Sequence, residues 1–284
     1  MLIKEMHTRF RIKFDKMATL SAPEYFPEDV DVLLNDAQDK LIDFYSNIKG
    51  LERTQSITDY LGEIVQRKEL SNPDIFIGPN QEPNGKYVTL PDNYRKMLME
   101  QVKLLIPDCV LVKSGKIKSG ILYMITSGSI VYNNNTYQKG DTFTGITNLL
   151  TYLGTGSVYE AKSKYARVRP IPRDNYLMDI RNPFKKPDSD IVLRLETGIF
   201  PKLTYELITD NKNIIQAYKL DYLRQPLQMK LGTEYATPVA DVQCELNNEA
   251  QIKIVDIAVT EALKILGDQR YSLNKQEQIQ ENNI

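Results

Sequence analysis

Side chains able to carry out acid–base or nucleophilic chemistry are scarce in this sequence. The chain has one histidine, His7, and two cysteines, Cys109 and Cys244, which stand far apart and form no CxxC pair. A Ser-His-Asp or Cys-His arrangement would have to use His7, and no nucleophile lies in an elbow motif such as GxSxG. We therefore interpret His7, which falls within a predicted amphipathic helix, as a helix-surface or interface residue.

Metal and cofactor sites are not indicated either. A single histidine excludes a histidine-rich metal site, and the acidic residues lack the DxDxDG spacing of calcium loops. The stretch Gly154–Ser157 has neither the Lys-Ser/Thr of a P-loop nor the GxGxxG pattern, so we interpret it as a loop. The sequence predicts no cofactor and no metal. An enzyme that uses two carboxylates alone, such as a glycosidase, stays open as a minor hypothesis.

A run of basic residues could contact an anionic partner. Its members alternate with other residues along a predicted strand and its lead-in, so several charges could share one side of a sheet. They are Lys162, Lys164, Arg167, Arg169 and Arg173. Such a stripe could face DNA phosphates or an acidic neighbour. Charges also protect a solvated strand edge from aggregation, and we favour that interpretation.

The composition is that of a folded globular protein with almost no net charge. Hydrophobic residues make up 42% and charged residues 26% of the chain. The net charge of −1 gives no global attraction to nucleic acid or to an anionic membrane. We see no signal peptide and no membrane-spanning segment, and cysteine usage suits a reducing cytoplasm. The chain has seventeen tyrosines and no tryptophan. This balance is equally compatible with tyrosines at protein interfaces and with tyrosines on half-buried strands.

Hydrophobic periodicity predicts helices at both ends of the chain and strands between them. Apolar residues three or four apart predict helices over 2–20, 27–50, 54–70 and 249–266, and a further short helix over 94–105. Alternating apolar residues bounded by turn residues predict strands over 87–90, 110–112, 121–125, 129–132, 167–171, 191–195, 202–208 and 214–223. Residues 72–85 and 183–187 are predicted loops.

This order of elements predicts an α+β fold with an N-terminal helical bundle, an antiparallel β-sheet region and a C-terminal helix that packs back on the bundle. We expect residues 1–100 and 245–271 to form the helical bundle part. Residues 101–244 should form the strand-rich antiparallel part. Residues 272–284 are rich in Gln, Asn and Glu and predict a polar flexible tail.

Short phrases in a fixed order carry a resemblance to one family. At the front, Phe14-Asp15-Lys16 precedes residues 27–38, which end in Leu-Asn-Asp-Ala-Gln, and residues 87–94 follow in the middle. At the back stand Tyr222-Leu223-Arg224-Gln225-Pro226, then 244–246, 254–259 and Asp268-Gln269-Arg270-Tyr271. The chain resembles the head-to-tail adaptor, or ring and tail-tubular, proteins of short-tailed phages, and most of all those of crAss-like phages. The strand-rich block over 104–159 departs from the smaller adaptors, which leaves the ring position open.

The resemblance implies a non-enzymatic structural virion protein. It implies a closed ring of about twelve copies in the portal-to-tail connector, assembled in the host cytoplasm, with the portal and other ring or tail proteins as neighbours and DNA passing through the lumen. We expect no membrane partner. A cytoplasmic protein-binding or regulatory module is the alternative. As interface residues we predict Tyr222, Arg224, Pro226, Arg270 and Tyr271.

Overall fold

The computed structural model describes residues 1–17, 25–48, 51–78, 81–112, 119–133, 135–145, 153–154, 156–198, 203–210 and 212–265. Two compact units make up the chain. The helical unit comprises Met1–Val65 and Leu223–Ile284, and the strand unit comprises Gln66–Tyr222. Both ends of the sequence therefore build the helical unit, and the strand unit is inserted between them. The predicted α+β class is confirmed.

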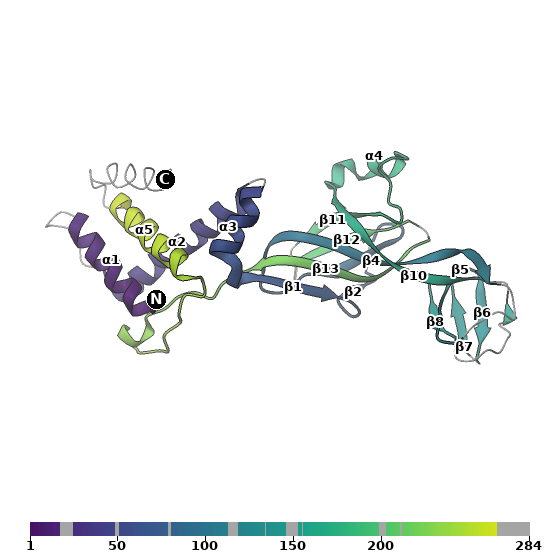
Figure 1. Cartoon of the computed structure of the whole chain (residues 1–284), viewed down its shortest axis with the longest axis horizontal. Helices are drawn as coiled ribbons and strands as arrows, with labels where there is room; N and C mark the ends of the chain where they lie inside the picture. The colour runs from purple at the N-terminus through teal and green to yellow at the C-terminus, as the bar shows by residue number, and fades with distance from the viewer. Residues whose placement is uncertain are drawn as a thin grey trace. The chain divides into compact units, whose positions relative to one another are not determined.

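The helical unit is formed by amphipathic helices that share one core. They are α1 (Ile3–Met17), α2 (Pro27–Asn47), α3 (Leu51–Leu61) and α5 (Asn248–Ile265). Helix α5 contacts the other three (Figure 1). Their stripes at helical spacing are buried: Met6 and Phe10 of α1, Leu34 and Leu41 of α2, and Ile254 and Ala258 of α5. The predicted helices over 2–20, 27–50 and 249–266 correspond to α1, α2 and α5.

The predicted helix over 54–70 is wrong beyond Leu61. Helix α3 ends there, a 3-10 turn η1 (Gly62–Ile64) follows, and β1 (Val65–Leu70) begins. Glycine is a poor helix former, and residues 65–69 are all exposed, so burial gives no reason to continue the helix.

One mixed sheet dominates the strand unit. Among the described residues its strands follow the order β1-β13-β4-β10-β11-β12-β3-β2. Their bounds are β2 (Ile75–Phe76), β3 (Gly85–Thr89), β4 (Tyr94–Val112), β10 (Ser157–Pro170), β11 (Ile191–Gly198), β12 (Thr204–Ile208) and β13 (Ile214–Arg224). Strand β10 pairs antiparallel with β4 but parallel with β11, so the expectation of a purely antiparallel sheet is wrong. A helix α4 (Tyr176–Arg181), absent from the predictions, lies between β10 and β11.

The sheet curls so that both of its edges contribute to one core. Leu70 of β1 and Ile75 of β2, from opposite ends of the strand order, are buried in the same cluster as Val192 of β11. A second cluster covers the other face of β11, where Tyr176 of α4 contacts Leu193 and neighbouring apolar residues. Strands β11 and β12 are therefore buried on both faces, which fits their consecutive apolar residues Ile191–Leu193 and Leu207-Ile208.

The predicted helix over 94–105 is also wrong. These residues open β4, a 19-residue strand that pairs with β10 from Gln101 to Val112. Val102 and Leu104 alternate into the core, with Lys103 between them less buried. Long-range pairing and burial therefore override the local resemblance to a helix.

At one end of the large sheet, β10 also pairs with β5 and β5 pairs with β8, and a separate three-stranded sheet, in the order β7-β6-β9, lies beside them (Figure 1). We call these strands the β5–β9 region: β5 (Leu122–Ser127), β6 (Ser129–Tyr132), β7 (Asn135–Gln138), β8 (Thr142–Thr144) and β9 (Leu153–Gly154). Its separate core contains Tyr123, Ile130 and Phe143. The predicted strands over 121–125 and 129–132 match β5 and β6. Gly128 between them adopts a φ of 68°, which glycine adopts without steric cost.

Candidate functional site: a buried polar network in the helical unit

A segment with little regular secondary structure leads from β13 to α5 and lies against the helices of the helical unit. We call residues 225–247 the return segment. The Ile3 backbone N–H of α1 donates a hydrogen bond to Gln243 Oε1 at 2.7 Å. Asn247 Nδ2 donates to the Asp59 carbonyl of α3. The return segment is thereby attached to both α1 and α3.

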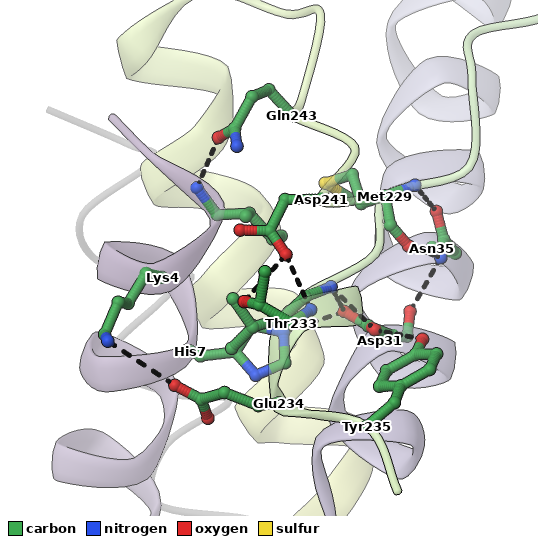
Figure 2. A network of polar contacts seen from close by, with 12 residues as sticks. Lys4, His7, Asp31, Asn35, Met229, Thr233, Glu234, Tyr235, Asp241 and Gln243 are labelled. Carbon is green, nitrogen blue, oxygen red and sulfur yellow. Dashed lines mark hydrogen bonds and ion pairs between the residues drawn. The ribbon is translucent and has the colours of Figure 1, made fainter. Parts of the chain in front are cut away.

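Attachment to α2 depends on the carboxylate of Asp31. It accepts hydrogen bonds from His7 Nε2 at 2.8 Å, from the Leu231 N–H at 3.0 Å and from the Tyr235 hydroxyl at 2.5 Å. Figure 2 shows Asp31 and His7 facing each other across α1 and α2, with the return segment beside them. Asp31 is 3% exposed and His7 is 2% exposed. A buried carboxylate needs such donors to offset its desolvation.

Asn35, one helical turn after Asp31, holds the backbone of the return segment. The Met229 N–H donates to Asn35 Oδ1 at 2.8 Å, and Asn35 Nδ2 donates to the Met229 carbonyl at 3.0 Å. The Asn35 side-chain amide therefore makes both backbone hydrogen bonds of Met229, as a residue of a paired β-strand would. Because Asp31 and Asn35 are four positions apart, they project from the same face of α2.

The return segment also folds on itself. Lys230 and Val242 form an antiparallel bridge, and the Thr233 N–H donates to Asp241 Oδ1 at 2.9 Å. A Cβ atom on Gly232 would lie 2.7 Å from the Val239 carbonyl oxygen, so a side chain does not fit there. This closed loop presents Leu231 and Tyr235 to Asp31. Burial and the Asp31 carboxylate raise the pKa of Tyr235, which keeps its hydroxyl protonated as a donor.

The interpretation of His7 as a helix-surface or interface residue is wrong for the surface, because the side chain is buried inside the helical unit. His7 lies on the same face of α1 as Ile3, Phe10 and Phe14, and that face is buried. Its pairing with Asp31 resembles the Asp–His half of a hydrolase relay. However, Nδ1 is buried and has no hydrogen-bond partner among the described residues, and the Asp31 oxygens are occupied by donors of the chain itself. The geometry is that of a structural contact that joins α1, α2 and the return segment.

The predicted interface residues that the structure describes face inward in the single chain. Tyr222 is 2% exposed, with its hydroxyl 2.9 Å from Gln66 Oε1. Arg224 forms a bidentate pair with Glu245, at 2.8 and 2.9 Å. Pro226 is buried at the start of the return segment. The remaining two, Arg270 and Tyr271, lie outside the described residues, and an interface role for the set stays a prediction.

The basic run divides between the two faces of β10. The register is regular from Ala161 to Arg167, so Lys162 and Lys164 project to one side and Arg167 and Arg169 to the other. Lys164 pairs with Asp190 at 2.7 Å. Arg169 lies 3.4 Å from Asp179, and Arg173 is beyond the strand, in the 3-10 turn η2 (Arg173–Asn175). No single stripe forms.

The core of the strand unit contains a buried ion pair that the sequence did not reveal. Arg194 of β11, 7% exposed, lies 3.1 Å from Glu100 Oε2 of β4, and the Tyr218 hydroxyl donates to the same oxygen at 2.6 Å. The Arg194 guanidinium also stacks 4.3 Å above the ring of Tyr205. Burial raises the pKa of Glu100, and Tyr218 and Arg194 oppose that shift. The pair joins three strands across the core.

The rest of the described residues hold no gathered metal ligands and no activated thiol. Within them, no three His, Cys, Asp or Glu side chains gather as metal ligands. None of the described helices is both long enough and apolar enough to cross a bilayer. Burial raises the pKa of the Cys244 thiol to about 11, which keeps it protonated and unreactive.

Part of the chain matches a known protein family. Residues 141–276 match the family described as phage tail ring protein 3/4, of crAss-like phages. The match covers slightly less than half of the chain and extends from β8 through α5. No curated protein matches the chain. The match supports a structural protein of a phage tail ring, a class of virion component that works by oligomeric assembly with other tail proteins.

Proposed function

We propose that the chain is a ring subunit of the connector between the portal and the tail of a tailed phage. About twelve copies would enclose a channel through which DNA passes without sequence-specific contacts. The match of residues 141–276 to phage tail ring proteins is the observation that supports this most directly.

The matched range cannot stand as a separate module. It contains β10 and β12, whose neighbours β4 and β3 lie before it, and α5, whose partners α1 and α2 also lie before it. Each unit therefore needs residues that lie before the match for the matched residues to adopt this structure. A net charge of −1 over the whole chain fits a channel wall that does not retain DNA.

Mass spectrometry and cryo-EM of purified particles test the proposal. We expect the chain in the particles at a fixed copy number, in a ring between head and tail. Absence from the particles, with the chain found only in the soluble fraction of infected cells, would overturn it and favour the cytoplasmic binding module.

A further inference from the structure

One face of the large sheet is covered by α4 over β11 but is open to solvent over three neighbouring strands. Arg169 of β10 pairs with Leu193 of β11, which lies in the cluster beneath α4. Because side chains alternate along a strand, Arg167 and Tyr165 share that face. Arg167 is exposed, and Tyr165 is 49% exposed. We call this face of β13, β4 and β10, which lie side by side, the open face (Figure 1).

Two lysines on the open face lie beside the Tyr165 ring. Lys103 of β4 is the paired neighbour of Tyr165 in the register between β4 and β10. From β13, on the other side of β4, the Lys219 ammonium lies 5.7 Å from the centroid of the same ring. Neither lysine forms an ion pair with a described residue. Like charges on neighbouring strands repel each other, and a bound anion would remove that repulsion.

The nearby carboxylates do not neutralise these two lysines. Asp221 of β13 accepts two hydrogen bonds from Arg67 of β1, at 2.7 and 2.8 Å. Asp190, at the end of β10 that pairs with β11, is bound by Lys164 at 2.7 Å. Glu69, two positions after Arg67, lies on the edge strand β1. The lysines beside the exposed tyrosine therefore remain as unpaired positive charge in the middle of the open face.

The neutral side chains of the open face are mostly polar. Gln101 is the paired neighbour of Arg167, and the Ser163 hydroxyl donates to Gln216 Oε1 at 3.3 Å. Met99, 49% exposed, is an apolar side chain on the same side of β4. The centres of protein–protein interfaces are apolar and poor in lysine, whereas protein–DNA interfaces are polar and positively charged. This composition favours phosphate groups over a protein surface as the partner.

We propose that the open face lines the channel of the ring, where Lys103, Lys219 and the Tyr165 hydroxyl contact the phosphates of duplex DNA. The inference rests on the proposed function, because that function supplies DNA in the lumen, and it assigns the surface that faces this DNA. Ammonium and hydroxyl groups donate hydrogen bonds to phosphate oxygens without reading the base sequence. With so few contacts in each subunit, the DNA can slide past the wall.

Binding of the full-length chain to a fluorescent DNA duplex of mixed sequence tests this assignment. We expect a dissociation constant of about 10⁻⁶ to 10⁻⁴ M for the wild type. Lys103→Gln with Lys219→Gln should weaken binding by roughly tenfold and reduce the slope of log K against log salt by about 2, because two phosphate contacts are lost. Tyr165→Phe should weaken binding by about 2- to 10-fold.

A matched double variant controls for net charge. Lys68→Gln with Lys212→Gln also removes two exposed lysines of the strand unit. Lys68 follows Arg67 on β1 and therefore projects from the opposite face, and Lys212 lies in the turn between β12 and β13. This variant should bind the duplex like the wild type.

The outcomes separate the assignment from the proposed function. A wild type that does not bind the duplex at low salt, a Lys103 and Lys219 variant that binds like the wild type, or a control variant that is weakened equally would each overturn the assignment. Binding of poly-glutamate through the same two lysines, without binding of the duplex, would overturn it in favour of an acidic protein partner. In all these cases a wild type found as a ring in purified particles leaves the ring function standing. Absence of the wild type from the particles would instead remove the ring function, and the channel with it, whatever the duplex binding.

Discussion

The His7 ring and the Asp31 carboxylate, 24 positions apart in the sequence, meet at 2.8 Å inside the helical unit. The Leu231 N–H, 200 positions beyond Asp31, reaches the same carboxylate. One buried charge thus joins two N-terminal helices to the segment that leads into α5. The helical unit consequently depends on a contact between the two ends of the chain.

Asp31→Asn should destabilise the helical unit. The amide keeps the shape but replaces one acceptor oxygen with an N–H₂ group, which then faces the Tyr235 hydroxyl or the Leu231 N–H. We expect a loss of about 2–3 kcal/mol in the free energy of unfolding, measured by urea denaturation. Asp36→Asn, on the exposed face of the same helix, is the control and should change it by less than about 0.5 kcal/mol. Equal effects of the two substitutions would refute the role given to Asp31.

Sequence periodicity predicted correctly those long helices that bury one face along their whole length. In α2 and α5 an apolar stripe persists over 21 and 18 residues, so the pattern alone set their limits closely. It failed where local pattern and tertiary pairing disagree. Residues 94–105 have apolar residues at helix-compatible spacing, yet their pairing with β10 decides their conformation.

Part of the polar network could have been predicted. His7 occupies the apolar stripe of α1, and Asp31 lies beside Val30 on the buried side of α2, so both were candidates for buried, paired groups. Their partners were not predictable. Leu231 and Tyr235 belong to a segment without periodicity, and only the folded chain brings them to Asp31.

Arg224→Glu should destabilise the helical unit before it affects any interface. It places two carboxylates where a bidentate ion pair stood, and we expect a loss of about 2–3 kcal/mol in chemical denaturation. Adding Glu245→Arg should recover part of this loss, though not all, because Glu245 also accepts the Leu227 N–H at 2.8 Å. If particle assembly recovers with folding, Arg224 acts within the chain. A folded double variant that still fails to assemble would assign Arg224 to the interface.

The same pair predicts acid sensitivity. The hydrogen bonds from Arg224 hold the pKa of Glu245 below its usual value of 4.5. A carboxyl whose pKa is lower in the folded state stabilises the fold at pH values above its unfolded pKa, and this contribution is lost as the pH falls through the folded pKa. Glu245→Gln should therefore lower stability at pH 7 and reduce its decline below about pH 4.5. Unfolding curves from pH 3 to 7 that stay parallel for variant and wild type would contradict this.

Phe143→Ala should unfold the β5–β9 region without unfolding the rest of the large sheet. Phe143 is 5% exposed, and its ring lies 5.5, 4.8 and 5.1 Å from the rings of Tyr123, Tyr132 and Tyr137. Removing the ring should lower the free energy of unfolding of this region by about 3–5 kcal/mol. Its separate core has few other residues that could compensate for this loss. Hydrogen exchange should accelerate in β5, β6 and β8, while β11 and β12 keep their protection. Thr144→Ala, at the exposed neighbouring position, is the control. Equal acceleration in β11 and β12 would instead show that the two cores unfold as one cooperative unit.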